Sequence, residues 1–125
     1  MIVGMGSTQI DFGVLTENET YSVSPAYHTF KINTSIINSK YFEYLLQAKN
    51  KTYTQKYMIA SARQGKTVNL KDLMKELIEI PSFDEQELII ERITLIERLM
   101  KNCENELNLL NEIIKSRFDK LIKEK

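Results

Sequence analysis

After Pro81 the apolar residues recur at alternating steps of four and three positions, and no Gly or Pro interrupts them. This spacing is typical of the seam of a coiled coil rather than the broader stripe of a helix packed on a globular core. A helix from about Asp84 to Glu124 would be roughly 60 Å long at 1.5 Å per residue. An element of that length is expected to join or space other parts of an assembly. The predicted seam consists of Ile89, Ile93, Ile96, Met100, Cys103, Leu107, Leu110, Ile114 and Leu121.

The start of this helix is marked by local signals. Pro81 lacks an N–H group and biases Ile80 away from helical geometry, so it suits a junction into a helix. Ser82 and Glu85 have the S-x-x-E spacing of a capping box, in which each satisfies a free N–H group of the first turn. We therefore divide the chain into a globular domain, residues 1–81, and a long helix, residues 82–125.

The first 81 residues predict an α+β domain with a small mixed or antiparallel sheet and short helices. Asn38 or Ser39 can cap one helix, and Asn69 can cap another. Aromatic and β-branched residues around Ser24-Pro25 favour strands that turn there. The predicted elements are a strand at Met1–Met5, strands within Tyr21–Ile32, helices through Lys49 and over Thr54–Ala62, a loop or strand at Gly65–Val68, a short helix through Lys75, and a strand at Leu77–Ile80.

Charge is unevenly distributed along the chain, although 17 basic and 17 acidic residues cancel overall. From Lys31 to Lys71 there are eight basic residues and one acidic residue, Glu43, which gives a local charge of +7. From Pro81 onward ten acidic residues exceed eight basic ones. A basic domain beside a slightly acidic helix suits phosphate contact in the first and protein contact along the second. The alternative is a solvated face of surface lysines.

Two loops concentrate the side chains that contact DNA. Direct readout of base edges uses Arg, Lys, Asn and Gln, whereas phosphates are contacted by basic and hydroxyl side chains and by main-chain N–H groups. Gly65 would allow close backbone approach in the second loop. Asn69, just beyond that loop, suits helix capping better than DNA contact. The candidate DNA-binding residues are Ser7, Thr8 and Gln9 in the first loop, Arg63, Gln64, Lys66 and Thr67 in the second, and Tyr27 and His28 between them.

Three segments resemble, in their order, the DNA-specificity subunits of type I restriction–modification systems. The run Ile80-Pro81-Ser82-Phe83-Asp84-Glu85-Gln86 is similar to that family's junction between domain and helix. The segment Ser24-Pro25-Ala26-Tyr27-His28-Thr29-Phe30 resembles part of a target recognition domain. The stretch from Arg63 to Leu70 resembles the loop before that domain's last short helix. The likeness covers about Tyr21 to the C-terminus.

The resemblance implies a fold, a function and partners. The domain would be the C-terminal part of a target recognition domain that reads double-stranded DNA. The helix would pair antiparallel with a second specificity half or a second copy, so that two domains are held a fixed distance apart. Methyltransferase subunits, and a restriction subunit in some assemblies, would supply the chemistry. Because the family's domain is usually longer, its opening strands are expected to be missing here.

The sequence predicts no catalytic residue, no metal ligand and no cofactor. Gly65-Lys66-Thr67 matches only the tail of a phosphate-binding loop. His28, the one histidine, has no Cys or acidic partner at metal-ligand spacing. Cys103 on the seam is expected to be a small buried residue in a reducing compartment. No run is apolar enough to span a membrane, and no signal peptide is visible, so we expect a cytoplasmic, non-enzymatic protein.

Two function hypotheses remain open at this point. The first is sequence-specific DNA recognition, as half of a specificity subunit that directs methyltransferase and restriction subunits. The second is a truncated remnant whose helix binds protein partners while its shortened domain reads no DNA. The target sequence, the oligomeric state and the location of the missing domain part do not follow from the residues.

Overall fold

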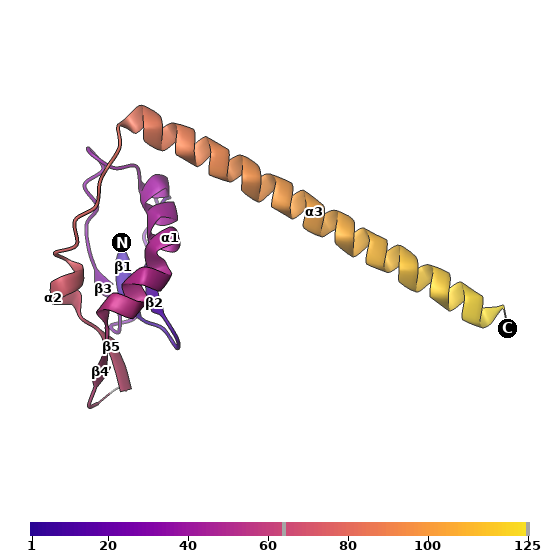
Figure 1. Ribbon diagram of the computed structural model, residues 1–125, viewed down its shortest axis with the longest axis horizontal. Coiled ribbons are helices and arrows are strands. Elements are labelled where there is room, and N and C mark those ends of the chain that lie inside the picture. Colours follow the sequence, from indigo (N-terminus) through magenta and orange to yellow (C-terminus); the bar gives the residue numbers. More distant parts are fainter. Residues whose placement is uncertain (64, 125) are drawn as a thin grey trace. The chain divides into compact units, whose positions relative to one another are not determined.

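The computed structural model describes residues 1–63 and 65–124 and is an α+β structure (Figure 1). Its contacts divide the chain into a globular unit, Met1–Glu87, and a second unit, Leu88–Lys125. The first turn of the long helix therefore belongs to the globular unit. The elements are β1 (Ile2–Met5), β2 (Ile10–Gly13), β3 (His28–Thr29), α1 (Ser39–Tyr57), β4 (Met58–Ser61), β5 (Gly65–Val68), α2 (Leu70–Leu73) and α3 (Phe83–Lys123).

The larger sheet has the antiparallel order β2-β1-β3, with β1 in the centre. The strand predicted at Met1–Met5 is confirmed as β1, whereas β2 was not predicted. Strand structure within Tyr21–Ile32 is limited to His28–Thr29, so the broader prediction is wrong. The turn predicted at Ser24-Pro25 is present, because the Tyr27 N–H donates to the Ser24 carbonyl oxygen at 3.0 Å.

Helix α1 confirms the predicted cap and corrects the predicted end. The side chain of Asn38 accepts a hydrogen bond from the Lys40 N–H, as an N-cap residue should. The helix does not stop near Lys49, and the separate helix over Thr54–Ala62 is wrong: α1 runs on to Tyr57 and the chain then enters β4. The physical reason is that no Gly or Pro interrupts this stretch, and Leu46, Tyr53 and Tyr57 continue one buried face.

The segment after α1 forms a hairpin and a short helix. Gly65–Val68 is a strand, β5, paired antiparallel with β4. Asn69 caps α2 as predicted, through its side chain and the Asp72 N–H, although the helix ends at Leu73 rather than Lys75. The strand predicted at Leu77–Ile80 is wrong. In the described part of the chain no strand pairs with this segment, and Leu77 is 93% exposed.

The core of the globular unit lies between α1 and the β2-β1-β3 sheet. Val3 and Ile10 are fully buried, and Leu46, Tyr53, Tyr57 and Leu73 complete the buried cluster. Burial of each large apolar side chain contributes about 1.5–3 kcal/mol to folding. Four of the six tyrosines are buried, as expected for residues that pack a small core: Tyr41, Tyr44, Tyr53 and Tyr57.

Helix α3 starts with the predicted capping box. The Ser82 N–H donates to Glu85 Oε2 at 3.0 Å, and the Glu85 N–H donates to Ser82 Oγ at 3.4 Å. Gln86, one residue further on, is completely buried. Its Oε1 accepts from the Asn38 N–H at 2.7 Å, and its Nε2 donates to the carbonyl oxygens of Ile36 and Pro81. This amide ties the first turn of α3 to the start of α1 within the globular unit.

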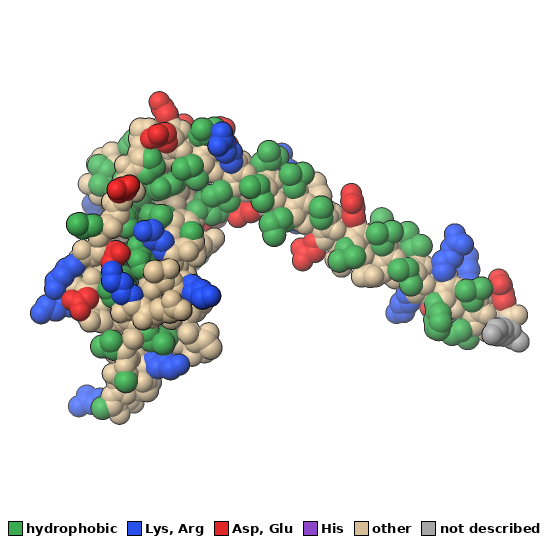
Figure 2. All heavy atoms as spheres, viewed as in Figure 1, with side chains coloured by type: hydrophobic (Ala, Val, Ile, Leu, Met, Phe, Trp, Pro, Cys, Tyr) green, Lys and Arg blue, Asp and Glu red, His purple; other side chains and the backbone are tan. Residues whose placement is uncertain are grey.

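From Leu88 onward the helix leaves its apolar residues largely in solvent. Figure 2 shows hydrophobic side chains along the face of α3 in view. Met100, Ile114 and Leu121 are about 65% exposed, and Cys103, expected to be buried, is exposed in the single chain. The apolar residues of the predicted seam are therefore largely accessible on this helix.

Candidate nucleic-acid interface

The first candidate loop is the turn between β1 and β2. Met5 pairs with Ile10, and the Gly6 N–H closes the turn by donating to the Gln9 carbonyl oxygen at 2.9 Å. The side chains of Ser7, Thr8 and Gln9 are all exposed. The three residues predicted to contact DNA thus lie together at the tip of a hairpin and are free to meet a partner.

Side chains of α1 hold this turn at its base. The Ile10 N–H donates to Thr54 Oγ1 at 3.0 Å, and Asn50 Nδ2 donates to the Ile10 carbonyl oxygen at 2.9 Å. Thr54 Oγ1 in turn donates to Asn50 Oδ1 at 3.1 Å. Because both backbone groups of Ile10 are satisfied by the helix, the exposed tip is carried on a rigid support, which reduces the cost of ordering it on binding.

The second candidate loop joins β4 to β5. Gly65 has φ +75°, a left-handed conformation that costs energy for residues with a Cβ atom. Arg63 and Lys66 are exposed, and Thr67 is half-buried. Gln64, the predicted base-reading residue, lies outside the described residues. The left-handed conformation explains why a glycine suits this position, whereas the predicted close approach of its backbone to DNA stays a prediction.

These two loops lie side by side. One open hollow is lined by Met5 at the end of β1, by Gly6 and Ser7 of the first loop, and by Gly65 and Lys66 at the start of β5, where the second candidate loop enters the strand. The hollow places a serine hydroxyl, a lysine ammonium group and glycine backbone together, which are groups that contact phosphate oxygens. The sequence singled out each loop separately, but gave no reason to expect them at one place.

Arg63 and Lys66 differ from two other cations of the globular unit, Lys56 and Lys75, which are engaged by carboxylates. Lys56 pairs with Glu76 at 2.7 Å, and Lys75 pairs with Asp72 at 3.2 Å. Among the described residues, Arg63 and Lys66 have no ion-pair partner. A cation without a carboxylate partner keeps its full charge available to a phosphate, which suits Arg63 and Lys66 to phosphate contact.

Tyr27 and His28 lie on the opposite side of β1 from β2. Tyr27 packs its ring against Gly4, where an added Cβ atom would lie 2.5 Å from the ring. Its hydroxyl donates to Asp11 Oδ2 at 3.1 Å. His28 pairs with Val3 in the sheet and is exposed. Tyr27 therefore has structural contacts of its own, whereas the His28 side chain is accessible to a partner.

Asp11 was not singled out by the sequence analysis, although it lies beside the candidate residues. Its carboxylate lies over Gly6, where an added Cβ atom would come within 2.6 Å of Oδ1. A sequence signal was present, since Asp11 is a charged residue between Ile10 and Phe12 in a short strand, but the strand itself was not predicted.

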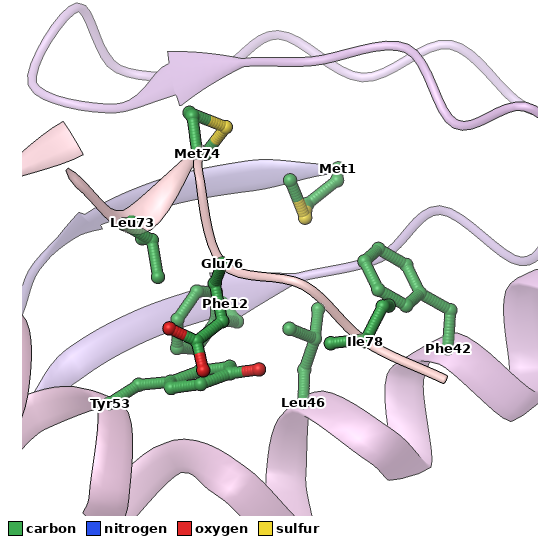
Figure 3. A pocket seen from close by; sticks show the side chains of 9 residues that line it. All are labelled: Met1, Phe12, Phe42, Leu46, Tyr53, Leu73, Met74, Glu76 and Ile78. Atoms are coloured by element: carbon green, nitrogen blue, oxygen red, sulfur yellow. The ribbon is translucent and has the colours of Figure 1, made fainter. Parts of the chain in front are cut away.

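A separate apolar cavity opens between the sheet, α1 and the segment after α2 (Figure 3). It measures about 160 Å³, and Glu76 reaches across it towards Tyr53. The Glu76 carboxylate accepts from Lys56 Nζ and from the Tyr57 hydroxyl, and these contacts lower its pKa, the lysine contact most. Among the described residues, no predicted DNA-binding residue lines this cavity, and the Glu76 carboxylate in its wall is engaged by Lys56 and Tyr57 of α1.

The described residues supply no group of three or more His, Cys, Asp or Glu side chains arranged to hold a metal ion. Within the same residues, every helix is too short or too polar to cross a membrane. Comparison of the chain with protein-family models, curated protein sequences and solved structures gives no significant match.

Proposed function

We propose that the chain recognises double-stranded DNA as half of a specificity subunit of a type I restriction–modification system. The observation that carries this proposal is the convergence of the two loops at one hollow, with Ser7 and Lys66 in its wall. The sequence predicts each loop to contact DNA, because each is rich in residue types that contact bases or phosphates. Their proximity gives a duplex one continuous surface to contact.

The second part of the proposal concerns α3. Its exposed apolar residues, which include Ile96, Leu107 and Ile114, recur at coiled-coil spacing. We propose that this seam pairs with the same helix of a second copy, or with the helix of a second specificity half. The antiparallel arrangement implied by the family resemblance would separate two DNA-reading domains by a fixed distance.

In this proposal the chain carries no catalysis of its own and acts in the cytoplasm. Methyltransferase subunits, joined in some assemblies by a restriction subunit, would bind the complex and supply the reactions. A direct check is incubation of the purified chain with S-adenosylmethionine and DNA, for which we expect no methyl transfer. Methylation by a preparation shown to lack other subunits would contradict this part of the proposal.

A second candidate function is favoured by the same exposed seam. The helix can act as a protein-interaction module whether or not the domain binds DNA, because its apolar residues lie in the second unit. In this alternative the hollow between the loops has no ligand. The two candidates differ in one measurable property, the affinity of the chain for a duplex as a function of salt concentration.

The deciding experiment is a fluorescence-anisotropy titration of a duplex carrying random sequence, repeated between 50 and 200 mM salt, about the range over which phosphate contacts weaken markedly. We expect binding that weakens steeply as salt rises. Replacing Arg63 and Lys66 by Ala should flatten the slope of log affinity against log salt by about one to two units. The fall should be similar for every duplex, because phosphate contacts carry no sequence information.

The matched control is Lys101→Ala, which removes an exposed lysine of α3 and should leave the slope unchanged. Gln64→Ala should instead change the preference among sequences, as expected for a base-reading side chain. Wild-type protein that binds no duplex even at 50 mM salt would leave only the interaction-module function.

A further inference from the structure

Asp11 occupies an unusual position for an acidic residue of this surface. It lies on β2 opposite Gly4, and its carboxylate covers Gly6, which is itself part of the wall of the hollow between the loops. The space exists because residue 6 has no side chain, since an added Cβ atom would lie 2.6 and 2.7 Å from the two carboxylate oxygens. Gly6 thus brings a carboxylate next to the groups that we propose contact phosphates.

Within the described part of the chain, one hydrogen bond orients the carboxylate. The Tyr27 hydroxyl donates to Oδ2 at 3.1 Å, and this bond raises the pKa of the tyrosine. Among the described residues no Lys, Arg or His pairs with Asp11, and no donor reaches Oδ1. Asp11 is half-buried, so its position is fixed while one acceptor oxygen remains free.

A free carboxylate beside a phosphate-binding hollow is unfavourable unless a donor meets it in the complex. Phosphates cannot be that donor, because they carry the same charge. Base edges can, because the N4 amino group of cytosine donates in the major groove and is the usual partner of Asp and Glu there. A carboxylate also excludes guanine and thymine at the same place, since both present acceptors.

We propose that Asp11 is a specificity-determining residue that accepts a hydrogen bond from a cytosine amino group, and that Tyr27 positions it. This inference rests on the proposed DNA-recognition function and deepens it. It assigns the roles within the surface: Ser7, Arg63 and Lys66 hold the duplex, whereas Asp11 distinguishes one base.

The test is selection of bound duplexes from a random library, followed by sequencing, with the full chain and its variants. Wild-type protein should enrich cytosine at one position by about 5- to 100-fold, which corresponds to one good base contact. Asp11→Asn keeps the shape and can still accept from Tyr27, but it should lose this preference or move it to adenine, which an amide recognises. Tyr27→Phe should weaken the preference without changing the salt slope.

The matched control is Glu19→Gln, because Glu19 also accepts from a tyrosine hydroxyl, at 2.9 Å, but lies outside the hollow. It should bind like the wild type. An unchanged cytosine preference in Asp11→Asn, or wild-type binding without any base preference, would overturn the role of Asp11 while leaving DNA binding intact. No binding of the wild type at any salt concentration would overturn the proposed function together with it. Near-ultraviolet circular dichroism, which reports the tyrosines, checks that each variant is folded.

Discussion

One isoleucine from each unit shows how differently apolar side chains can be placed in this chain. In the globular unit Ile10 is fully buried, whereas Ile114 in the second unit is 65% exposed. Burial of one such side chain contributes about 1.5–3 kcal/mol, so the globular unit obtains stability from its own residues. The side chain of Ile114 remains exposed on its helix. We propose that apolar residues of the first unit specify a core, whereas those of α3 specify a surface that pairs with a second chain.

The largest expected effect comes from the same truncation made in both units. Ile10→Ala should lower the free energy of unfolding of the globular unit by about 2–5 kcal/mol, because it leaves a cavity under β2. Ile114→Ala should leave that value unchanged and weaken self-association instead. Near-ultraviolet circular dichroism separates the units, since all six tyrosines lie between Tyr21 and Tyr57 and the chain has no Trp. If both variants shifted the unfolding transition of the tyrosine signal equally, the two units would not be independent in stability.

A smaller effect is expected at Gln86, where the helix begins. Gln86→Leu would leave the Asn38 N–H and the carbonyl oxygens of Ile36 and Pro81 without their partner. Unsatisfied buried groups of this kind cost about 1–3 kcal/mol, measurable by urea denaturation. The control is Gln47→Leu, the same change at an exposed position of α1. If both variants unfold at the same urea concentration, the buried amide does not anchor the first turn of α3.

The smallest effect concerns acid. The contact with Lys56, and to a smaller extent that with Tyr57, lowers the pKa of Glu76 in the folded state. These contacts therefore stabilise the fold fully at pH values above 4.5, the pKa of Glu76 in the unfolded chain, and this stabilisation is lost as the pH falls through the pKa of the folded state. Glu76→Gln should therefore be less stable than the wild type at neutral pH and should lose less stability on acidification. Thermal unfolding at pH 7 and pH 3 measures the difference. Glu79→Gln removes the same charge without the Lys56 contact and should retain the wild-type response.

Signals that act within a few residues were predictable from sequence. The caps at Asn38 and Asn69 and the capping box of Ser82 and Glu85 depend only on a side chain and nearby backbone groups, and all three are present. The end of α1 was not predictable in this way. The sequence predicted a break between Lys49 and Thr54, but Tyr53 and Thr54 lie on the buried face of one continuous helix that covers β2.

Secondary structure that depends on residues distant in the sequence was also missed. β2 exists through its pairing with β1, and the segment 77–80 has no strand beside it despite its apolar composition. The candidate site shows the same limit. Both loops were predicted from their content of residue types that contact DNA. Their proximity was not, because it depends on packing between residues about 60 positions apart, such as Ser7 and Lys66. The position of Asp11 could be recognised only from its contact with Tyr27.

We propose that the two units have different purposes, one to contact DNA and one to join two chains. Sedimentation velocity tests the second half most directly, at tens of micromolar, roughly the range in which an association of moderate affinity is populated. We predict a dimer for the wild type and a monomer for the double variant Ile96→Asp, Leu107→Asp, with unchanged tyrosine circular dichroism. A wild-type monomer at that concentration would contradict self-association through α3 and with it this account of the exposed seam.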